Sequence, residues 1–454
     1  MKKQIYMAII AVAMISCKTY KIYERPDDLS ISSSYRDIAE DSDTTTLANL
    51  SWKELFTDSH LRSLIETGLE KNTDLQIARL HIEQAEAVLM SSRLAYLPSV
   101  NLSPQGTLSS FDGSKATKTY SLAASASWGI EIFGKLTNQK REAVAALEGS
   151  RAYRQAVQTK LIATVAGSYY SLLMLDKQLA INLSTLENWD RSIKAMESLK
   201  RAGQMNDAGI LQAKANRLSL ESAILQVKKS INETENSLSV LLGHEASLIE
   251  RGSLAEQNFS DDVTIGVPLQ LLGNRPDVRQ AEFNLAQSFY ATNVARTAFY
   301  PSLTLSGSAG WTNSAGSAIV NPGELLVSAV GSLVQPLFNK GINVANLKIT
   351  KAQQEEAKLL FQQSILNAGE EVNDALVQWQ TARNRINIGN QQIETLHEAV
   401  RKTELLMKHS SLNYLEVLTA QQSLLQAEQA QAQNYFDEIQ GVINLYHALG
   451  GGIE

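Results

Sequence analysis

Four stretches of the chain alternate apolar and small polar residues, as strands with one apolar face do. The alternation is clearest from Tyr120 to Phe133 and weaker from Ser99 to Phe111. Two later stretches, Ser302 to Trp311 and Leu325 to Phe338, repeat the arrangement. An apolar face with aromatic residues near its ends is typical of transmembrane barrel strands. A soluble antiparallel sheet with one hydrated face explains the same alternation, so the strands alone leave both interpretations open.

Long stretches without proline follow each pair of strands. The first runs from Leu136 to Arg201 and the second from Gly341 to Lys408. A continuous helix of that length would measure roughly 100 Å, which exceeds what a compact globule needs and indicates coiled coils. Each is followed by a short break and a returning helix, which ends at Gly243 in the first case and at Gly450 in the second. The pattern therefore predicts two long helical hairpins.

The second half of the chain repeats the first. Residues 275–305, moved back by 203 positions, fall on residues 72–102 with eight identical pairs. The pairs are Asp277 and Asp74, Ala281 and Ala78, Gln287 and Gln84, Arg296 and Arg93, Ala298 and Ala95, Pro301 and Pro98, Ser302 and Ser99, and Leu305 and Leu102. In both copies a helical pattern breaks at the Pro-Ser pair and continues as a strand. We therefore predict one body built from two similar halves of about 200 residues.

These patterns predict the organisation of the whole chain. In order, it comprises a lipoprotein signal peptide (1–16), a lipid-anchored extended tether (17–50), helices of the first repeat (51–98), two transmembrane strands (99–133), a helical hairpin (134–243), a connector (244–274), a helix of the second repeat (275–300), two further transmembrane strands (301–338), a second helical hairpin (339–450) and a tail (451–454). Within the first repeat, apolar residues at helical spacing from Trp52 to Asn72 predict a single short amphipathic helix.

The N-terminal residues have the pattern of an export signal. Lys2 and Lys3 precede an apolar run from Ile5 to Ile15, which is too short to span a bilayer as a mature helix. The only cysteine of the chain, Cys17, follows at once, and the four residues that end at it resemble a bacterial lipoprotein signal. This resemblance implies that Cys17 carries lipid and that the protein is sorted to the outer membrane. The alternative is an incidental cysteine in a signal peptide that is removed further on.

Charge and residue content narrow the classes of function. The net charge is −6, and no basic block is interleaved with aromatic residues, which argues against a nucleic-acid partner. The six histidines never occur in a ligand-like spacing, and no phosphate-binding glycine-rich loop is present. We therefore expect no enzyme activity, no catalytic or metal site and no cofactor.

The number of strands predicts the number of chains. Four strands cannot close a transmembrane barrel, because the smallest known barrels have eight. Two chains would supply eight strands and three would supply twelve. An eight-stranded barrel is filled by its own side chains, so a water-filled pore favours twelve. The sequence therefore predicts a homotrimer with a twelve-stranded membrane β-barrel and a long α-helical coiled-coil barrel below it.

Several motifs resemble those of one family. They are Trp128-Gly129-Ile130-Glu131-Ile132-Phe133-Gly134-Lys135, Asn274-Arg275-Pro276-Asp277-Val278, Ala298-Phe299-Tyr300-Pro301-Ser302, Gln335-Pro336-Leu337-Phe338 and the stretch from Asn413 to Gln421. Through them the chain resembles the outer membrane factor family, the TolC-like proteins, and its lipoprotein branch that serves resistance-nodulation-division efflux pumps. The resemblance implies a passive exit duct in the outer membrane. A periplasmic adaptor protein and an inner-membrane transporter would dock below it and supply the energy.

The tips of the two hairpins are where a closed tunnel would be held shut. Charged residues of both signs flank the turns, and we predict that the acidic ones form a ring that constricts the pore and that ion pairs between the hairpins hold it closed. These gate candidates are Arg201, Asp207, Arg401, Glu404 and Glu416. The turn residues expected to contact the adaptor are Gly203, Gln204, Met205, Ser410, Ser411 and Leu412. The alternative is a hydrated surface, where each ion pair is worth roughly 0–1 kcal/mol.

A function without a pore is also compatible with the sequence. A lipid-anchored periplasmic coiled-coil scaffold would use the same long helices, and its strands would form a soluble cap. Such a scaffold would be monomeric or dimeric in detergent and electrically silent. Oligomeric mass and conductance therefore distinguish the scaffold from the duct.

Overall fold

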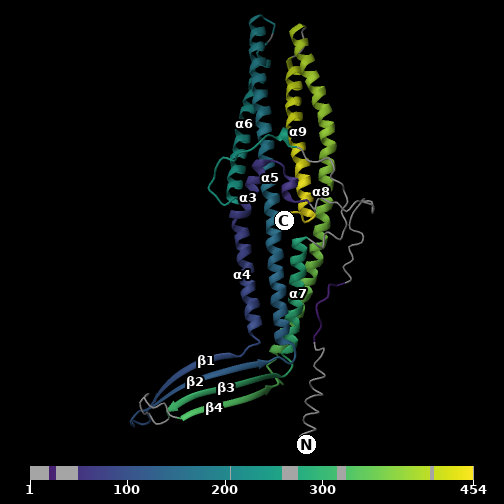
Figure 1. The fold of residues 1–454 in the computed structure, drawn as a ribbon. Helices are drawn as coiled ribbons and strands as arrows, with labels where there is room; N and C mark the ends of the chain where they lie inside the picture. Colours follow the sequence, from purple (N-terminus) through teal and green to yellow (C-terminus); the bar gives the residue numbers. More distant parts are fainter. Residues whose placement is uncertain are drawn as a thin grey trace. The chain divides into compact units, whose positions relative to one another are not determined.

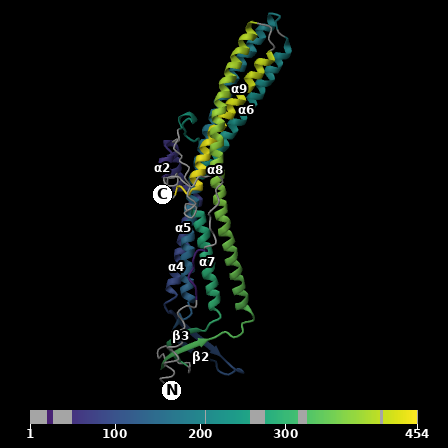
Figure 2. The same ribbon diagram turned by 90° about the vertical axis from the view of Figure 1, so that its right-hand side faces the viewer.

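The structure, a computed structural model, describes residues 20–26, 50–204, 206–257, 275–313, 324–409 and 414–452 (Figures 1 and 2). The chain divides into two compact units, and each takes residues from both halves of the sequence. The first unit holds residues 1–30, 80–152 and 279–363, and the second holds the remainder. The predicted signal peptide, Cys17 and most of the predicted tether lie outside the described residues.

The elements occur in the same order in both halves of the chain. In the first half they are α2 (Trp52–Leu55), α3 (Ser59–Lys71), α4 (Thr73–Leu94), β1 (Ser99–Ser109), β2 (Thr117–Ile130), α5 (Lys135–Arg201), α6 (Asp207–Leu241) and the 3-10 helix η3 (Leu254–Glu256). In the second half they are α7 (Pro276–Thr297), β3 (Ser302–Asn313), β4 (Glu324–Val334), α8 (Ile342–His409) and α9 (Tyr414–Ala448). The hairpin helices have 67 and 35 residues in the first half and 68 and 35 in the second. The predicted duplication, with four strands and long helices, is confirmed.

The four strands form one antiparallel sheet in the first unit, in the order β1-β2-β3-β4 (Figure 1). The central pair, β2 and β3, joins the two halves of the chain. Residues opposite each other in neighbouring strands share a face. One row across the sheet contains Leu102, Ala124, Ala309 and Val327, and the next row contains Asn101, Ser125, Ser308 and Ser328. The register therefore gathers most of the apolar residues on one face and most of the small polar residues on the other, while Val330 and Val334 of β4 lie on the polar face.

The apolar face of the sheet is uncovered in the single chain. Val100, Leu102, Val327 and Leu333 are 72%, 68%, 67% and 67% exposed. A contiguous apolar surface of this kind requires lipid or another protein to cover it. The outer edges of the sheet are also free, because among the described strands β1 pairs only with β2 and β4 only with β3.

The expected single helix from Trp52 to Asn72 is wrong, because the structure has two helices there. Phe56 ends α2 in an extended conformation and is fully buried. Asp58 then caps α3, since its Oδ1 accepts hydrogen bonds from the backbone N–H groups of His60 (2.8 Å) and Leu61 (3.4 Å). The buried ring of Phe56 and the capping carboxylate of Asp58 therefore interrupt the predicted helix.

Residues 20–26 lie along the helices of the first unit. Arg25 forms an ion pair with Glu282 of α7, with Nε 2.9 Å from Oε1. The carbonyl of Lys21 accepts a hydrogen bond from Asn293 Nδ2 of the same helix (3.2 Å). The ring of Tyr23 meets that of Phe289 edge-on, with centroids 5.8 Å apart. This N-terminal segment is therefore attached to α7 by charged, polar and aromatic contacts.

The second unit contains α6, α9 and the parts of α5 and α8 that are nearer the hairpin turns. Figures 1 and 2 show α8 and α9 running side by side as one hairpin. Trp189 and Met196 of α5, Ile210 and Leu220 of α6, and Leu418 and Leu425 of α9 belong to one buried apolar cluster that joins the two hairpins. Among the helices that the structure describes, none is both apolar enough and long enough to cross a membrane.

Candidate functional site

The turn of the first hairpin is fixed by a glycine. Gly203 has a φ of +76°, and its N–H donates to the carbonyl of Lys200 (2.9 Å). The N–H of Gln204 donates to the carbonyl of Leu199 (3.0 Å). These two bonds are those of a Schellman motif, which needs a left-handed residue where glycine is favoured. The turn residues Gly203 and Gln204 therefore end α5, whereas Met205, Ser410, Ser411 and Leu412 lie outside the described residues.

The five charged gate candidates are spread over the tips of both hairpins. Arg201 and Asp207 lie on either side of the first turn, Arg401 and Glu404 lie in the last turns of α8, and Glu416 lies in the first turn of α9. Asp207 pairs with Lys200 across the first turn, and Arg201 donates to Ser198 Oγ (3.0 Å). Arg401 lies 3.8 Å from Glu398 of the same helix. Among the described tip residues, no recorded ion pair joins the two hairpins, so the acidic constriction and the ion-paired latch stay predictions.

Near the tips, an uncharged side chain links the two hairpins. Gln421 of α9 donates from Nε2 to Ser192 Oγ of α5 (3.2 Å) and to Glu404 Oε1 of α8 (3.1 Å). Gln421 is only 7% exposed, and its Oε1 accepts no hydrogen bond from the residues that the structure describes. A buried acceptor without a partner costs roughly 1–3 kcal/mol. Burial of this oxygen therefore costs folding free energy. The side chain links α5, α8 and α9 near the tips, so movement of the tips would break the link.

Sequence reasoning missed Gln421 as a site residue, although its spacing carries a signal. Val417, Gln421 and Leu425 are four residues apart and all are buried, so the glutamine interrupts the apolar stripe of α9. Further along α9, Gln429 donates to Asn182 of α5 (2.6 Å). Polar side chains within the buried stripe of α9 therefore mark its contacts with neighbouring helices.

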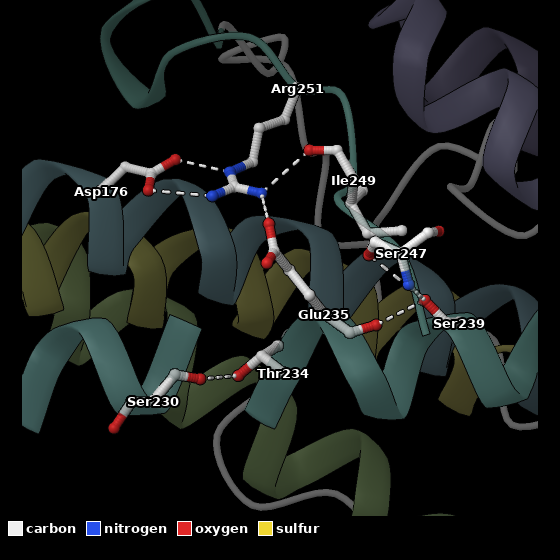
Figure 3. Close-up of polar contacts among 8 residues, drawn as sticks. All are labelled: Asp176, Ser230, Thr234, Glu235, Ser239, Ser247, Ile249 and Arg251. Carbon is white, nitrogen blue, oxygen red and sulfur yellow. Dashed lines mark hydrogen bonds and ion pairs between the residues drawn. The ribbon is translucent and has the colours of Figure 1, made fainter. Parts of the chain in front are cut away.

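Arg251 holds the connector at the base of the first hairpin (Figure 3). Its guanidinium donates to both carboxylate oxygens of Asp176 on α5 (2.6 and 3.1 Å) and to Glu235 on α6. It also donates to the carbonyl of Ile249 (2.9 Å). The hydrogen bonds that Arg251 donates to Asp176 and Glu235 outweigh burial and raise the pKa of Arg251 above its usual range. This residue therefore stays charged and joins the connector to both helices of the hairpin.

Arg275 makes a similar junction in the second half. Its side chain is 2% exposed, and it pairs with Asp277 (2.7 Å) and with Glu371 of α8 (2.6 Å). Its Nη1 donates to the carbonyl of Ala448 at the end of α9 (2.9 Å). Burial would raise the pKa of Asp277, but the hydrogen bonds and charge of Arg275 more than offset burial and lower it. The Arg-Pro-Asp motif therefore fixes the start of α7 against the second hairpin.

The part of the chain that the structure describes offers little for metal chemistry. No group of three or more His, Cys, Asp or Glu side chains there could hold a metal ion. The charged groups described above pair with one another at helix junctions and tips. These pairs hold neighbouring helices in position.

Known proteins share this arrangement over nearly the whole chain. A family model described as outer membrane efflux protein matches residues 64–244 and 267–451. The cation efflux system protein CusC of Escherichia coli O6:H1 is 29% identical over 452 residues, which cover 98% of this chain and 97% of CusC. The probable outer membrane lipoprotein SilC of Salmonella typhimurium is 27% identical over 404 residues, or 88% of each chain.

Solved structures show the same fold. A crystal structure of CusC superimposes with a TM-score of 0.84 at 27% identity and covers 95% of this chain and 99% of that one. The open state of the MtrE outer membrane channel of Neisseria gonorrhoeae gives a TM-score of 0.85 at 25% identity, with 96% and 98% coverage. The predicted fold class is confirmed by these neighbours.

Proposed function

The chain belongs to the outer membrane efflux protein family, and we propose that three identical copies form its exit duct, a twelve-stranded barrel continued by a helical tunnel. As a member of this family it is an outer membrane efflux channel, which conducts substrates outwards from a tripartite pump. The conduction is passive. A scaffold without a pore has no support from the family.

One observation carries the assembly proposal: the described sheet has two unpaired edges and an exposed apolar face. In a bilayer no water is available for the free N–H and C=O groups of an edge strand, so membrane sheets close on themselves. Four strands per chain require several chains for closure. Three chains give the twelve strands that leave room for water inside, with the Ser/Thr face turned to the pore.

The hairpins supply the docking end of the duct. A periplasmic adaptor protein contacts the tip turns, namely Gly203, Gln204 and Met205 in the first hairpin and Ser410, Ser411 and Leu412 in the second. An inner-membrane transporter supplies the energy, and the duct itself catalyses no reaction. Arg201, Asp207, Arg401, Glu404 and Glu416 are the charged residues that gate its entrance.

Lipid on Cys17 anchors each copy in the outer membrane. The described segment that begins at Tyr20 lies only three residues beyond this cysteine and is attached to α7. At no more than about 3.6 Å per residue, the Cα atom of the cysteine that would carry the lipid is within roughly 11 Å of that of Tyr20. Incorporation of radiolabelled palmitate into the wild-type protein, and its loss in Cys17→Ala, tests the assignment.

The duct is tested by the mass and the conductance of the purified full chain. Native mass spectrometry in detergent is expected to give a species of three chains, and planar bilayers are expected to show discrete conductance steps. A monomer or dimer without conductance would overturn the proposal and return the strands to a soluble sheet. A conducting species of two chains would overturn the trimer alone.

A further inference from the structure

A cavity of about 850 Å³ lies in the first unit, where the sheet meets the helices. The end of β2, the starts of β3 and α5, and parts of α7 and α8 line it. Gly129 and Thr304 border the cavity and are opposite each other in the register, on the face that carries serine and threonine. Ile130 and Leu303 of the apolar face also line the cavity, so it lies at the end of the sheet and reaches both faces. Its polar side, next to Gly129, Thr304 and Glu131, is the side that the proposed duct turns to the pore.

Two carboxylates and one amine border this cavity. Glu131 continues the polar alternation of β2 by one residue, and its Oε2 accepts a hydrogen bond from the N–H of Thr137 (2.9 Å). Glu142, in the second turn of α5, is half-buried, and burial raises the pKa of its carboxyl. No cation pairs with Glu142 among the residues that the structure describes. Lys135 also lines the cavity, but its side chain is exposed to solvent.

The rest of the polar lining is neutral. Asn343 and Asn346 lie three residues apart in the first turns of α8, which places them on one side of that helix, and Asn339 lies just before its start. Asn339 donates to Asn343 Oδ1 (3.4 Å), and Asn343 donates to the carbonyl of Ala298 (3.0 Å). These amides are held by one another and by the backbone. The net charge of the cavity is therefore set by Glu131, Glu142 and Lys135, two negative groups against one positive.

We propose that Glu142 determines the charge preference of the duct at the base of the sheet, where it favours small cations and amines over anions. The inference rests on the proposed function, because it requires an open pore bordered by this cavity. A carboxylate beside low-dielectric walls attracts cations more strongly than it would in bulk water. Three copies around one pore add their fields, whereas the charge of Glu131 is partly balanced by the backbone N–H groups at the start of α5.

The test is the reversal potential of single channels of the full-length trimer under a KCl gradient. Glu142→Gln is expected to lower the ratio of K⁺ to Cl⁻ permeability by roughly twofold or more, since each copy loses one charge. Lys135→Gln is expected to raise the ratio. Glu148→Gln is the matched control: Glu148 lies six residues further along α5, borders a different cavity and pairs with Arg151 (3.0 Å). Its ratio is expected to equal that of the wild type.

A second variant covers the case in which Glu142→Gln does not assemble. Cys17 is the only natural cysteine, so Glu142→Cys introduces a thiol that can be modified in the bilayer after assembly. A positively charged thiol reagent is expected to lower the permeability ratio and a negatively charged one to raise it. Conducting channels whose permeability ratio changes neither with the substitution nor with the reagents would overturn the inference and leave the proposed duct intact. A wild-type protein without conductance would instead overturn the proposed function, and the inference with it.

Discussion

The side-chain amide of Gln421 on α9 lies 3.2 Å from the hydroxyl of Ser192 on α5 and forms a hydrogen bond between the two hairpins near their tips. The same nitrogen donates to Glu404 on α8. Gln421 is buried, and Leu418 and Leu425 on the same helix belong to the apolar cluster that contains Trp189, so little water reaches this link. Movement of one hairpin away from the other must break the bond between Gln421 and Ser192.

Gln421→Leu is expected to open the tips more often. Leucine has a similar volume and removes both the link and the buried acceptor without a partner, so folding should suffer little. Loss of one hydrogen bond, about 0.5–1.5 kcal/mol, shifts the ratio of open to closed channels about two- to tenfold for each copy. Single-channel open probability measures this shift. Gln426→Leu changes an exposed residue of the same helix and is the control; equal open probabilities in the two variants would contradict the role of the link.

Neighbouring residues of β1 should respond oppositely to a new charge. Leu102→Arg places a guanidinium on the exposed apolar face and is expected to cost up to about 2–4 kcal/mol of membrane insertion. Asn101→Arg places the same group on the polar face, where water is present, and is expected to insert like the wild type. The amount of trimer in purified outer membranes measures insertion. Similar losses for both variants would show that the two faces do not differ in their surroundings.

Asp277 should stabilise the protein at neutral pH and stop doing so in acid. Its pKa in the folded protein lies below the unfolded value of about 4, so its contribution is complete above that value and is lost as the pH falls through the folded pKa. Asp277→Asn is expected to cost about 1 kcal/mol at pH 7, less than for a wholly buried pair, because the side chain is 46% exposed.

The measurement is the midpoint of thermal unfolding between pH 2 and 7. The midpoints of the wild type and Asp277→Asn should differ at pH 7 and become equal in acid. Asp74 is the residue that matches Asp277 in the duplication, but it is exposed in the first turn of α4. Asp74→Asn therefore makes the same chemical change without the ion pair and should leave the midpoint unchanged. A constant difference at every pH would assign the effect of Asp277→Asn to packing.

Two glycines with left-handed backbones should differ in their tolerance of alanine. Gly203 and Gly243 have φ values of +76° and +71°, so alanine strains both by roughly 1–2 kcal/mol. A Cβ at Gly203 would meet nothing within 4 Å, whereas one at Gly243 would lie 2.7 Å from the carbonyl oxygen of Lys71. Gly243→Ala should therefore lower the unfolding midpoint more than Gly203→Ala. Equal midpoints would contradict the close approach of α3 to this turn.

The main elements could be predicted from the sequence because their signals are local. A period of two marks the strands, the absence of proline marks the long helices, and the match of Asp277 to Asp74 marks the duplication. The interruption at Asp58 was missed, because a capping carboxylate within an apolar pattern gives no change of period. The charged residues at the tips could be located, but their partners could not.

By itself the sequence determined the four strands, the two hairpins and the family resemblance. Only the tertiary structure decided which residues meet: Gln421 with Ser192, and Arg275 with Glu371. These pairs are far apart in the chain, and which of them form depends on register and packing over the whole unit. The period of the apolar pattern in a segment shows which face each side chain occupies. The partner of that side chain belongs to another segment, whose register is set separately.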